Sequence, residues 1–138
     1  MAKATFGTAI NCMDGRTQIP VIEYMKRTYG VDYVDTITEP GPDGILGDKT
    51  DMILVESIRR RVDISVRAHG SKHVAIVAHF DCAGNPAEPK VHLEQAQRAV
   101  ELIESWGYNC EVVALWLDQD FEVHLIDEAF KAKIWSRG

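Results

Sequence analysis

Residues 5–16 have the sequence TFGTAINCMDGR, in which an uncharged, largely apolar run passes into a polar turn. The run from Thr5 to Asn11 is typical of a short buried strand. The turn that follows holds a thiol at Cys12, a carboxylate at Asp14 and a guanidinium at Arg16. In α/β sheets, ligands bind at the carboxyl ends of the strands. We therefore expect the fold to be organised around the end of this first strand.

Apolar residues recur at the spacing of amphipathic helices in three segments. The first begins at Pro20, the second runs from Met52 to Val66 and the third from Leu93 to Ile103. The first helix should end at Gly30, because glycine takes the left-handed conformation of a helix C-terminus without steric cost. Asp48 is expected to cap the N-terminus of the second helix. A terminal helical piece is predicted over residues 128–135.

Strand patterns alternate with these helices. Four strands are predicted over residues 5–11, 31–38, 73–78 and 110–117, and residues 121–126 are expected to return antiparallel to the fourth. The breaker-rich segment Glu39 to Gly44 is predicted to be a loop at the rim of any pocket formed by the strand ends. The fold class is therefore α/β, with a central parallel sheet of about four strands in the order 2-1-3-4, helices on both faces and a short antiparallel C-terminal strand. We expect the 138 residues to form a single domain, 1–138.

Composition argues against several classes of protein. A net charge of -6 is the opposite of the basic surface that nucleic-acid binding requires, and the Arg59-Arg60-Arg61 run falls within a helical pattern as a solvated face. Charges interrupt every apolar run well before the ~20 residues that span a membrane. The N-terminus lacks the apolar region of a secretory signal, so a cytoplasmic location is expected. In that compartment three cysteines favour metal binding, catalysis or burial over disulfides.

A second group of reactive side chains follows the third predicted strand, where residues 79–82 read HFDC. If the first and third strands are neighbours, the switch point between them brings Cys12, His79 and Cys82 together. A free cysteine taken alone usually packs as a small hydrophobe. A core thiol, however, has no reason to lie in a polar turn or to be repeated beside a histidine. Two thiolates and one imidazole are ligands that zinc accepts readily, so these three residues are candidate metal ligands.

The remaining cysteine and histidines are given structural roles. Cys110 begins a strand far from either motif in sequence and is expected to be structural. The other histidines are expected at the surface or at helix ends; they are His69, His73, His92 and His124. Among them, His92 follows a proline-containing loop predicted over residues 81–89 and is the one to consider as a substitute ligand or proton carrier.

Taken together, the two motifs resemble those of the β-class carbonic anhydrases. In that family a Cys-x-Asp-x-Arg turn and a later His-x-x-Cys pair hold zinc at the carboxyl edge of a parallel sheet, and here the matching residues are 12–16 and 79–82. The helix before the third strand and the closing hairpin, residues 117–126, also resemble the family. The chain is thus similar to a short member of the β class over most of its length.

This resemblance implies that Cys12, His79 and Cys82 bind Zn²⁺, and that Asp14 either occupies the fourth position or turns to pair with Arg16. In the open state a zinc-bound water becomes hydroxide near neutral pH and attacks CO2 to give bicarbonate. Asp14 and Arg16 would then be the catalytic pair that controls the fourth position and orients the nucleophile. The resemblance also implies a homodimer or a higher homo-oligomer.

Other functions stay open on the sequence alone. The same zinc hydroxide could act on a related linear molecule, such as carbonyl sulfide or carbon disulfide. A noncatalytic member could bind zinc or bicarbonate, with Asp14 permanently closing the metal. A redox protein that uses Cys12 and Cys82 as a dithiol pair is the weakest alternative, because it leaves Asp14, Arg16 and His79 without roles.

Overall fold

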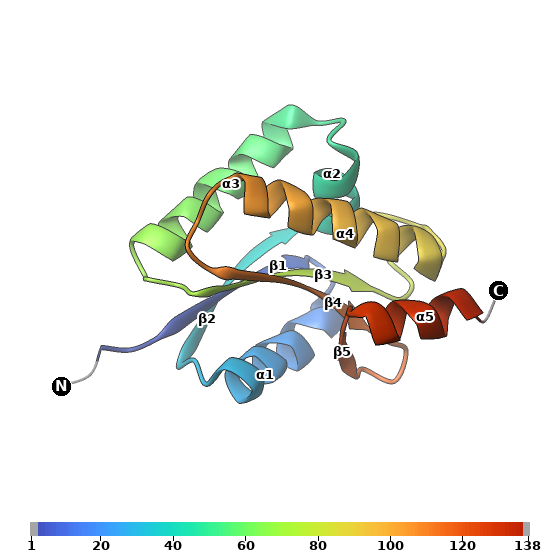
Figure 1. Ribbon diagram of the computed structural model, residues 1–138, viewed down its shortest axis with the longest axis horizontal. Helices are drawn as coiled ribbons and strands as arrows, with labels where there is room; N and C mark the ends of the chain where they lie inside the picture. The colour runs from blue at the N-terminus through green and yellow to red at the C-terminus, as the bar shows by residue number, and fades with distance from the viewer. Residues whose placement is uncertain (1–2, 137–138) are drawn as a thin grey trace.

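A five-stranded sheet lies at the centre of the protein, whose computed structural model describes residues 3–136 (Figure 1). The helices and strands follow one another in this order: β1 (Phe6–Cys12), a single 3-10 turn (Gly15–Thr17), α1 (Gln18–Tyr29), β2 (Tyr33–Glu39), α2 (Pro42–Asp48), α3 (Met52–Arg67), β3 (His73–His79), α4 (Pro89–Ser105), β4 (Glu111–Leu117), β5 (Val123–Leu125) and α5 (Glu128–Ser136). Strands and helices therefore alternate as the sequence predicts, except that an additional helix, α2, precedes α3.

The strand order is β2-β1-β3-β4-β5. The first four strands are parallel, and β5 runs antiparallel to β4. Ile10 of β1 pairs with Ile37 on one side and Ile76 on the other, so three isoleucines lie side by side across the middle of the sheet. The predicted order 2-1-3-4 with a short antiparallel C-terminal strand is confirmed.

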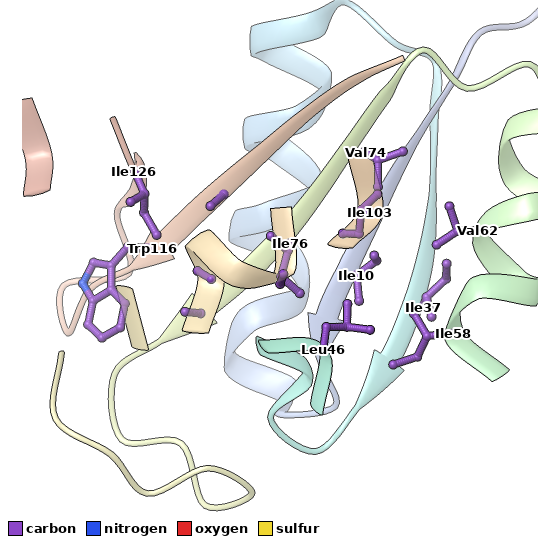
Figure 2. Packing of buried hydrophobic residues seen from close by; sticks show 14 of the residues in the cluster. Ile10, Ile37, Leu46, Ile58, Val62, Val74, Ile76, Ile103, Trp116 and Ile126 are labelled. Atoms are coloured by element: carbon purple, nitrogen blue, oxygen red, sulfur yellow. The ribbon is translucent and has the colours of Figure 1, made fainter. Parts of the chain in front are cut away.

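Helices cover both faces of the sheet, but unequally. In Figure 1, α2, α3 and α4 lie on one side and α1 lies on the other. Because successive side chains of a strand point to opposite faces, Ile10 and Ile76 pack under the three helices (Figure 2), whereas Ala9 and Ala75 pack against α1. Both faces of β1 and β3 are thus buried, which explains why these strands read as continuous apolar runs.

The connection between β2 and α2 differs from the prediction. Glu39 is the last residue of β2 and Pro42 is the first of α2, so only residues 40–41 lie outside regular structure. Proline is well tolerated at this position, since the first N–H groups of a helix have no partner within the helix. The prediction of a loop over Glu39 to Gly44 is therefore wrong at both ends, and Asp43 is buried within it at 1% exposure.

The predicted cap of α3 is also wrong. Asp48 is the last residue of α2, which ends where Lys49 takes the left-handed conformation at φ 54°. Asp51 caps α3 instead, because its side chain accepts a hydrogen bond from Leu54 N at 3.2 Å. The predicted end of α1 is confirmed, since Gly30 follows it at φ 65°. Among the described residues, no helix has both the length and the apolar composition needed to cross a bilayer.

Candidate metal centre

The turn after β1 is held by its own polar side chains. The Asn11 side chain accepts a hydrogen bond from Cys12 N at 2.9 Å and donates one to Thr17 O at 3.3 Å. The buried Thr17 hydroxyl donates to Asp14 O at 2.7 Å, and Gln18 Nε2 donates to Cys12 O at 2.7 Å. These contacts close the turn on itself, so the direction of the Cys12 side chain is fixed by the sequence that follows it.

Cys12, His79 and Cys82 converge where β1 and β3 end. All three are buried, and their candidate ligand atoms lie within 4.8 Å of one another. The two sulfur atoms are 3.9 Å apart, and both cysteines are free. Two thiolates on one tetrahedral zinc, each ~2.3 Å from the metal, are about 3.8 Å apart, whereas a disulfide needs about 2.05 Å. The spacing therefore suits a shared metal ion.

The His79 ring is oriented for metal binding by its neighbour. Nδ1 lies 2.6 Å from Phe80 O, and because a carbonyl can only accept, Nδ1 carries the hydrogen. The lone pair is then on Nε2, which is buried and has no hydrogen-bond partner. An orphaned buried nitrogen of this kind is costly, and a ring fixed through its other nitrogen is typical of metal-binding histidines. A metal ion therefore fits the residues present.

The two thiols have opposite electrostatic surroundings. Burial alone would raise the pKa of Cys12, but in the metal-free site a protonated His79 and the backbone N–H groups of Gly41 and Asp14 outweigh it and lower the pKa from 9.0 to about 7. A metal ion would instead bind the neutral imidazole. Burial raises the pKa of Cys82 to about 11, the charge of Cys12 adds to this, and the Asn85 backbone N–H acts in the opposite direction. Cys12 therefore ionises more readily than Cys82, and a bound cation would favour the thiolate form of both cysteines.

Asp14 is turned toward Arg16. Arg16 donates to Asp14 from its backbone N at 2.9 Å, from Nε at 3.1 Å and from Nη2 at 2.7 Å. These hydrogen bonds lower the pKa of the Asp14 carboxyl to about 2. The guanidinium also donates to Asp81 O at 3.2 Å and lies 4.9 Å from the centre of the Phe80 ring. The Asp14 carboxylate is therefore ionised and held by a fixed partner beside the three candidate ligands.

The other cysteine and histidines lie outside this group. Cys110 immediately precedes β4 and is partly buried. His92 lies near the start of α4, but it is buried at 1% exposure rather than at the surface, and its Nδ1 contacts Asp43 at 2.5 Å. Asp43 and the neighbouring Asn85 were not predicted from the sequence. Asp43 falls in the segment expected to be a loop, where a buried carboxylate has no sequence pattern to reveal it.

A second cluster of potential ligands lies at the turn between β4 and β5. Asp118, Glu122 and His124 offer atoms within 4.8 Å of one another. Asp118 Oδ1, however, already accepts hydrogen bonds from the backbone N of Asp120 and Glu122, and Oδ2 contacts His124 Nε2 at 2.6 Å. These contacts close the hairpin turn, which gives the cluster a structural role.

Comparison with known proteins shows which family the chain belongs to. Residues 2–127 match the family described as "Putative carbonic anhydrase". The chain belongs to this carbonic anhydrase family. No curated protein sequence matches the chain.

Solved β-carbonic anhydrases share the fold of this family member. Isoform I from Trichomonas vaginalis superposes with a TM-score of 0.58 at 16% identity, over 91% of this chain and 85% of that one. A mutant of CafD from Aspergillus fumigatus gives 0.55 at 12% identity, over 93% and 91%. A structure from a study of two tetrameric enzymes of Sordaria macrospora gives 0.52 at 13% identity, over 91% and 82%. The resemblance to the β class read from the two motifs is confirmed.

Proposed function

We propose that this carbonic anhydrase family member catalyses the reversible hydration of CO2 to bicarbonate, with a zinc ion held by Cys12, His79 and Cys82. The observation that carries the proposal is the buried group of two thiols and one imidazole beside an ionised Asp14. Family membership supports the substrate, and the donor set supports the metal.

Each residue has a distinct task in this proposal. Bound zinc would lower the pKa of a water ligand far below its value in bulk water, to about 7, and so supply a nucleophile near neutral pH. The Cys12 and Cys82 thiolates and His79 Nε2 hold the ion, and Phe80 O keeps the imidazole in the required tautomer. Asp14 is ionised near neutral pH, so it can accept a hydrogen bond from a hydroxyl group beside it and orient that group. Arg16 keeps the Asp14 carboxylate away from the fourth ligand position of the zinc.

We also propose that the chain works as a homodimer or larger homo-oligomer. The proposal is supported by the tetrameric enzymes of Sordaria macrospora and by exposed apolar side chains next to the candidate centre. Met13 is 64% exposed directly after Cys12, and Ile19 is 68% exposed in the first turn of α1. Sedimentation equilibrium should give a mass that is a multiple of 15.5 kDa; a monomer at micromolar concentration would contradict this.

Metal analysis and stopped-flow CO2 hydration on one preparation test the proposed reaction. We expect about one zinc per chain, because three protein ligands and an open position are typical of catalytic zinc. Cys12→Ser should lose both zinc and activity, whereas Cys110→Ser should keep both. Protein expressed with ample zinc that contains none would overturn the proposal. Bound zinc without CO2 hydration would overturn the substrate, and carbonyl sulfide and carbon disulfide would then be assayed on the same sample.

A further inference from the structure

A buried polar cluster adjoins the candidate metal centre and has no role in the proposed reaction. It joins Asp43 of α2, His92 and Gln95 of α4, and Asn85 of the loop after β3. Asn85 Nδ2 donates to Asp43 Oδ1 at 3.2 Å and to Gln95 Oε1 at 2.7 Å. The other Asp43 oxygen contacts His92 Nδ1 at 2.5 Å. Asp43 and His92 are each 1% exposed and Gln95 is 5% exposed, whereas Asn85 is partly buried, so most of the cluster is shielded from water.

The cluster is connected to both candidate thiolate ligands through the backbone. Asn85 lies three residues after Cys82 and donates its N–H to Cys82 O at 3.3 Å. On the other side, Asp43 lies four residues after Glu39, which pairs with Cys12 across the sheet and whose carbonyl accepts a hydrogen bond from Met13 N at 3.1 Å. One side-chain contact, Asn85 to Asp43, therefore links the segment that carries Cys82 to the segment that follows Glu39, the strand partner of Cys12.

These two segments pack without spare room. A Cβ on Gly41, which has φ +64°, would lie 2.6 Å from Asn85 Cβ. A Cβ on Gly84 would lie 2.6 Å from Pro40 Cβ. Such contacts leave no space for one segment to slide past the other, so a change in the Asn85 side chain must be transmitted to the backbone that carries Cys82.

A buried cluster of this kind is better suited to fixing geometry than to adding stability. Apolar side chains of similar volume would often be as stabilising, because charges and amides are desolvated when they are buried. A fully satisfied network instead favours a single arrangement. Here both amide hydrogens of Asn85 and both oxygens of Asp43 are used.

We propose that Asn85, Asp43 and His92 are positioning residues of the metal centre. They hold residues 82–85 against residues 40–43, so that the sulfur atoms of Cys82 and Cys12 keep the spacing that one metal ion requires. None of the three belongs to the group of candidate ligands, and their effect would pass through the loop. This inference rests on the zinc site of the proposed function, and it adds the residues that set the affinity of that site.

An isosteric swap tests the inference. Asn85→Asp replaces both donors with a carboxylate that faces Asp43, while Asn85→Asp combined with Asp43→Asn restores a donor and an acceptor with reversed polarity. Zinc affinity, measured by competition with a chromophoric chelator, should fall by at least ~10-fold in the single variant, the range seen when outer partners of metal ligands are lost. The double variant should recover to within about threefold of the unmodified protein. Asn85→Ala, which adds no second carboxylate, provides the same test if the first variant does not fold.

A matched control separates positioning from stability. Ser65→Ala removes a buried hydroxyl that contacts Thr8 Oγ1 at 2.6 Å and Asp35 Oδ2 at 2.7 Å, away from the metal centre. It should lower the free energy of unfolding without changing zinc affinity or the thiolate-to-metal absorption of the Co²⁺-loaded protein. The Asn85 variants should change both metal readouts.

The possible outcomes separate the two proposals. Equal zinc affinity in Asn85→Asp, Asn85→Ala and the unmodified protein overturns the inference and leaves the proposed function intact. If the double variant does not recover zinc affinity, the inference is also overturned. Failure of the zinc-loaded unmodified protein to hydrate CO2 overturns the proposed reaction, while the affinity comparison still decides the inference.

Discussion

Arg16 is held in place by more than its ion pair with Asp14. Its guanidinium donates to Asp81 O and lies over the Phe80 ring, and these two residues directly follow His79 in the chain. The Arg16 side chain therefore bridges the turn after β1 and the turn after β3. A guanidinium that is fixed from both sides can hold the Asp14 carboxylate in one orientation, which a flexible ammonium could not do.

Replacing Arg16 tests this role. Arg16→Gln should keep zinc but reduce CO2 hydration by about 100-fold or more, because Asp14 loses its partner and becomes free to take the fourth metal position. Stopped-flow hydration and metal content measured on the same sample check this. Arg67→Gln is the matched control, since Arg67 forms an exposed pair with Asp63 on α3 and should leave both values unchanged. Hydration within threefold of the unmodified protein in Arg16→Gln would contradict the role.

The residues of the candidate site differ in how far sequence could predict them. The approach of Cys12, His79 and Cys82 was predictable, because the residue types are distinctive and each motif follows a readable strand. Their role as zinc ligands stays a prediction. Asp43 and Asn85 were not predictable, because they meet across 42 residues and neither lies in a periodic pattern. Long-range pairing of ordinary polar residues leaves no local trace in a single sequence.

Among the elements, α2 shows how tertiary contacts override local composition. Its sequence begins with proline and contains two glycines, which favours a loop. The helix forms because it packs on α4, where Gly47 lies so close to Gln95 that a Cβ would be 2.6 Å from Gln95 O. Arg98 of α4 completes the contact by donating to Gly47 O at 3.1 Å and to Asp48 at 3.0 Å. The error at Asp48 has the same cause.

The cap of α3 can be tested by substitution. Asp51→Ala should lower the free energy of unfolding by about 1 kcal/mol, because Leu54 N loses its side-chain acceptor at the exposed start of the helix. Asp51→Ser keeps an acceptor and should stay within a few tenths of a kcal/mol of the unmodified protein. Urea denaturation at neutral pH measures both. Equal stability of the alanine and serine variants would show that the cap contributes nothing.

The turn between β4 and β5 should make stability depend on pH. Burial opposes ionisation of Asp118, but His124 and the backbone N–H groups of Glu122 and Asp120 lower its pKa below 3.8. Because the folded pKa is depressed, the contribution is fully present above the unfolded value and is lost as pH falls through the folded one.

Comparing variants at several pH values measures this contribution. Asp118→Asn should reduce the free energy of unfolding by about 1 kcal/mol near pH 6. The difference from the unmodified protein should shrink as pH falls from 3.8 through the lower folded pKa, where Asp118 itself becomes protonated in the native state. Asp120→Asn, which alters only an exposed carboxylate of the same turn, should show little difference at any pH. A difference that is independent of pH would exclude the carboxylate charge as its source.

At the scale of the whole molecule, the order of the strands brings the site together. β1 and β3 pair as neighbours although about 60 residues of chain lie between them, because parallel strands can be joined only by long crossover connections. The sequence was sufficient for this topology because strand and helix periodicities alternate clearly and crossovers have one hand. A metal ion bound to Cys12, His79 and Cys82 would join the carboxyl ends of the two central strands. Its binding would therefore stabilise the whole fold.

Removing the metal should therefore destabilise the entire molecule. Three ligands assembled by folding bind zinc only in the native state, so zinc at 100 times its dissociation constant should add about 2.7 kcal/mol, or about 10 °C in Tm. Thermal unfolding with zinc and with excess chelator measures the shift. Cys12→Ser should lose the shift, because one ligand is missing. Cys110→Ser should keep it, because Cys110 lies outside the group of candidate ligands. A zinc-dependent shift that survives in Cys12→Ser would show that the ion binds elsewhere.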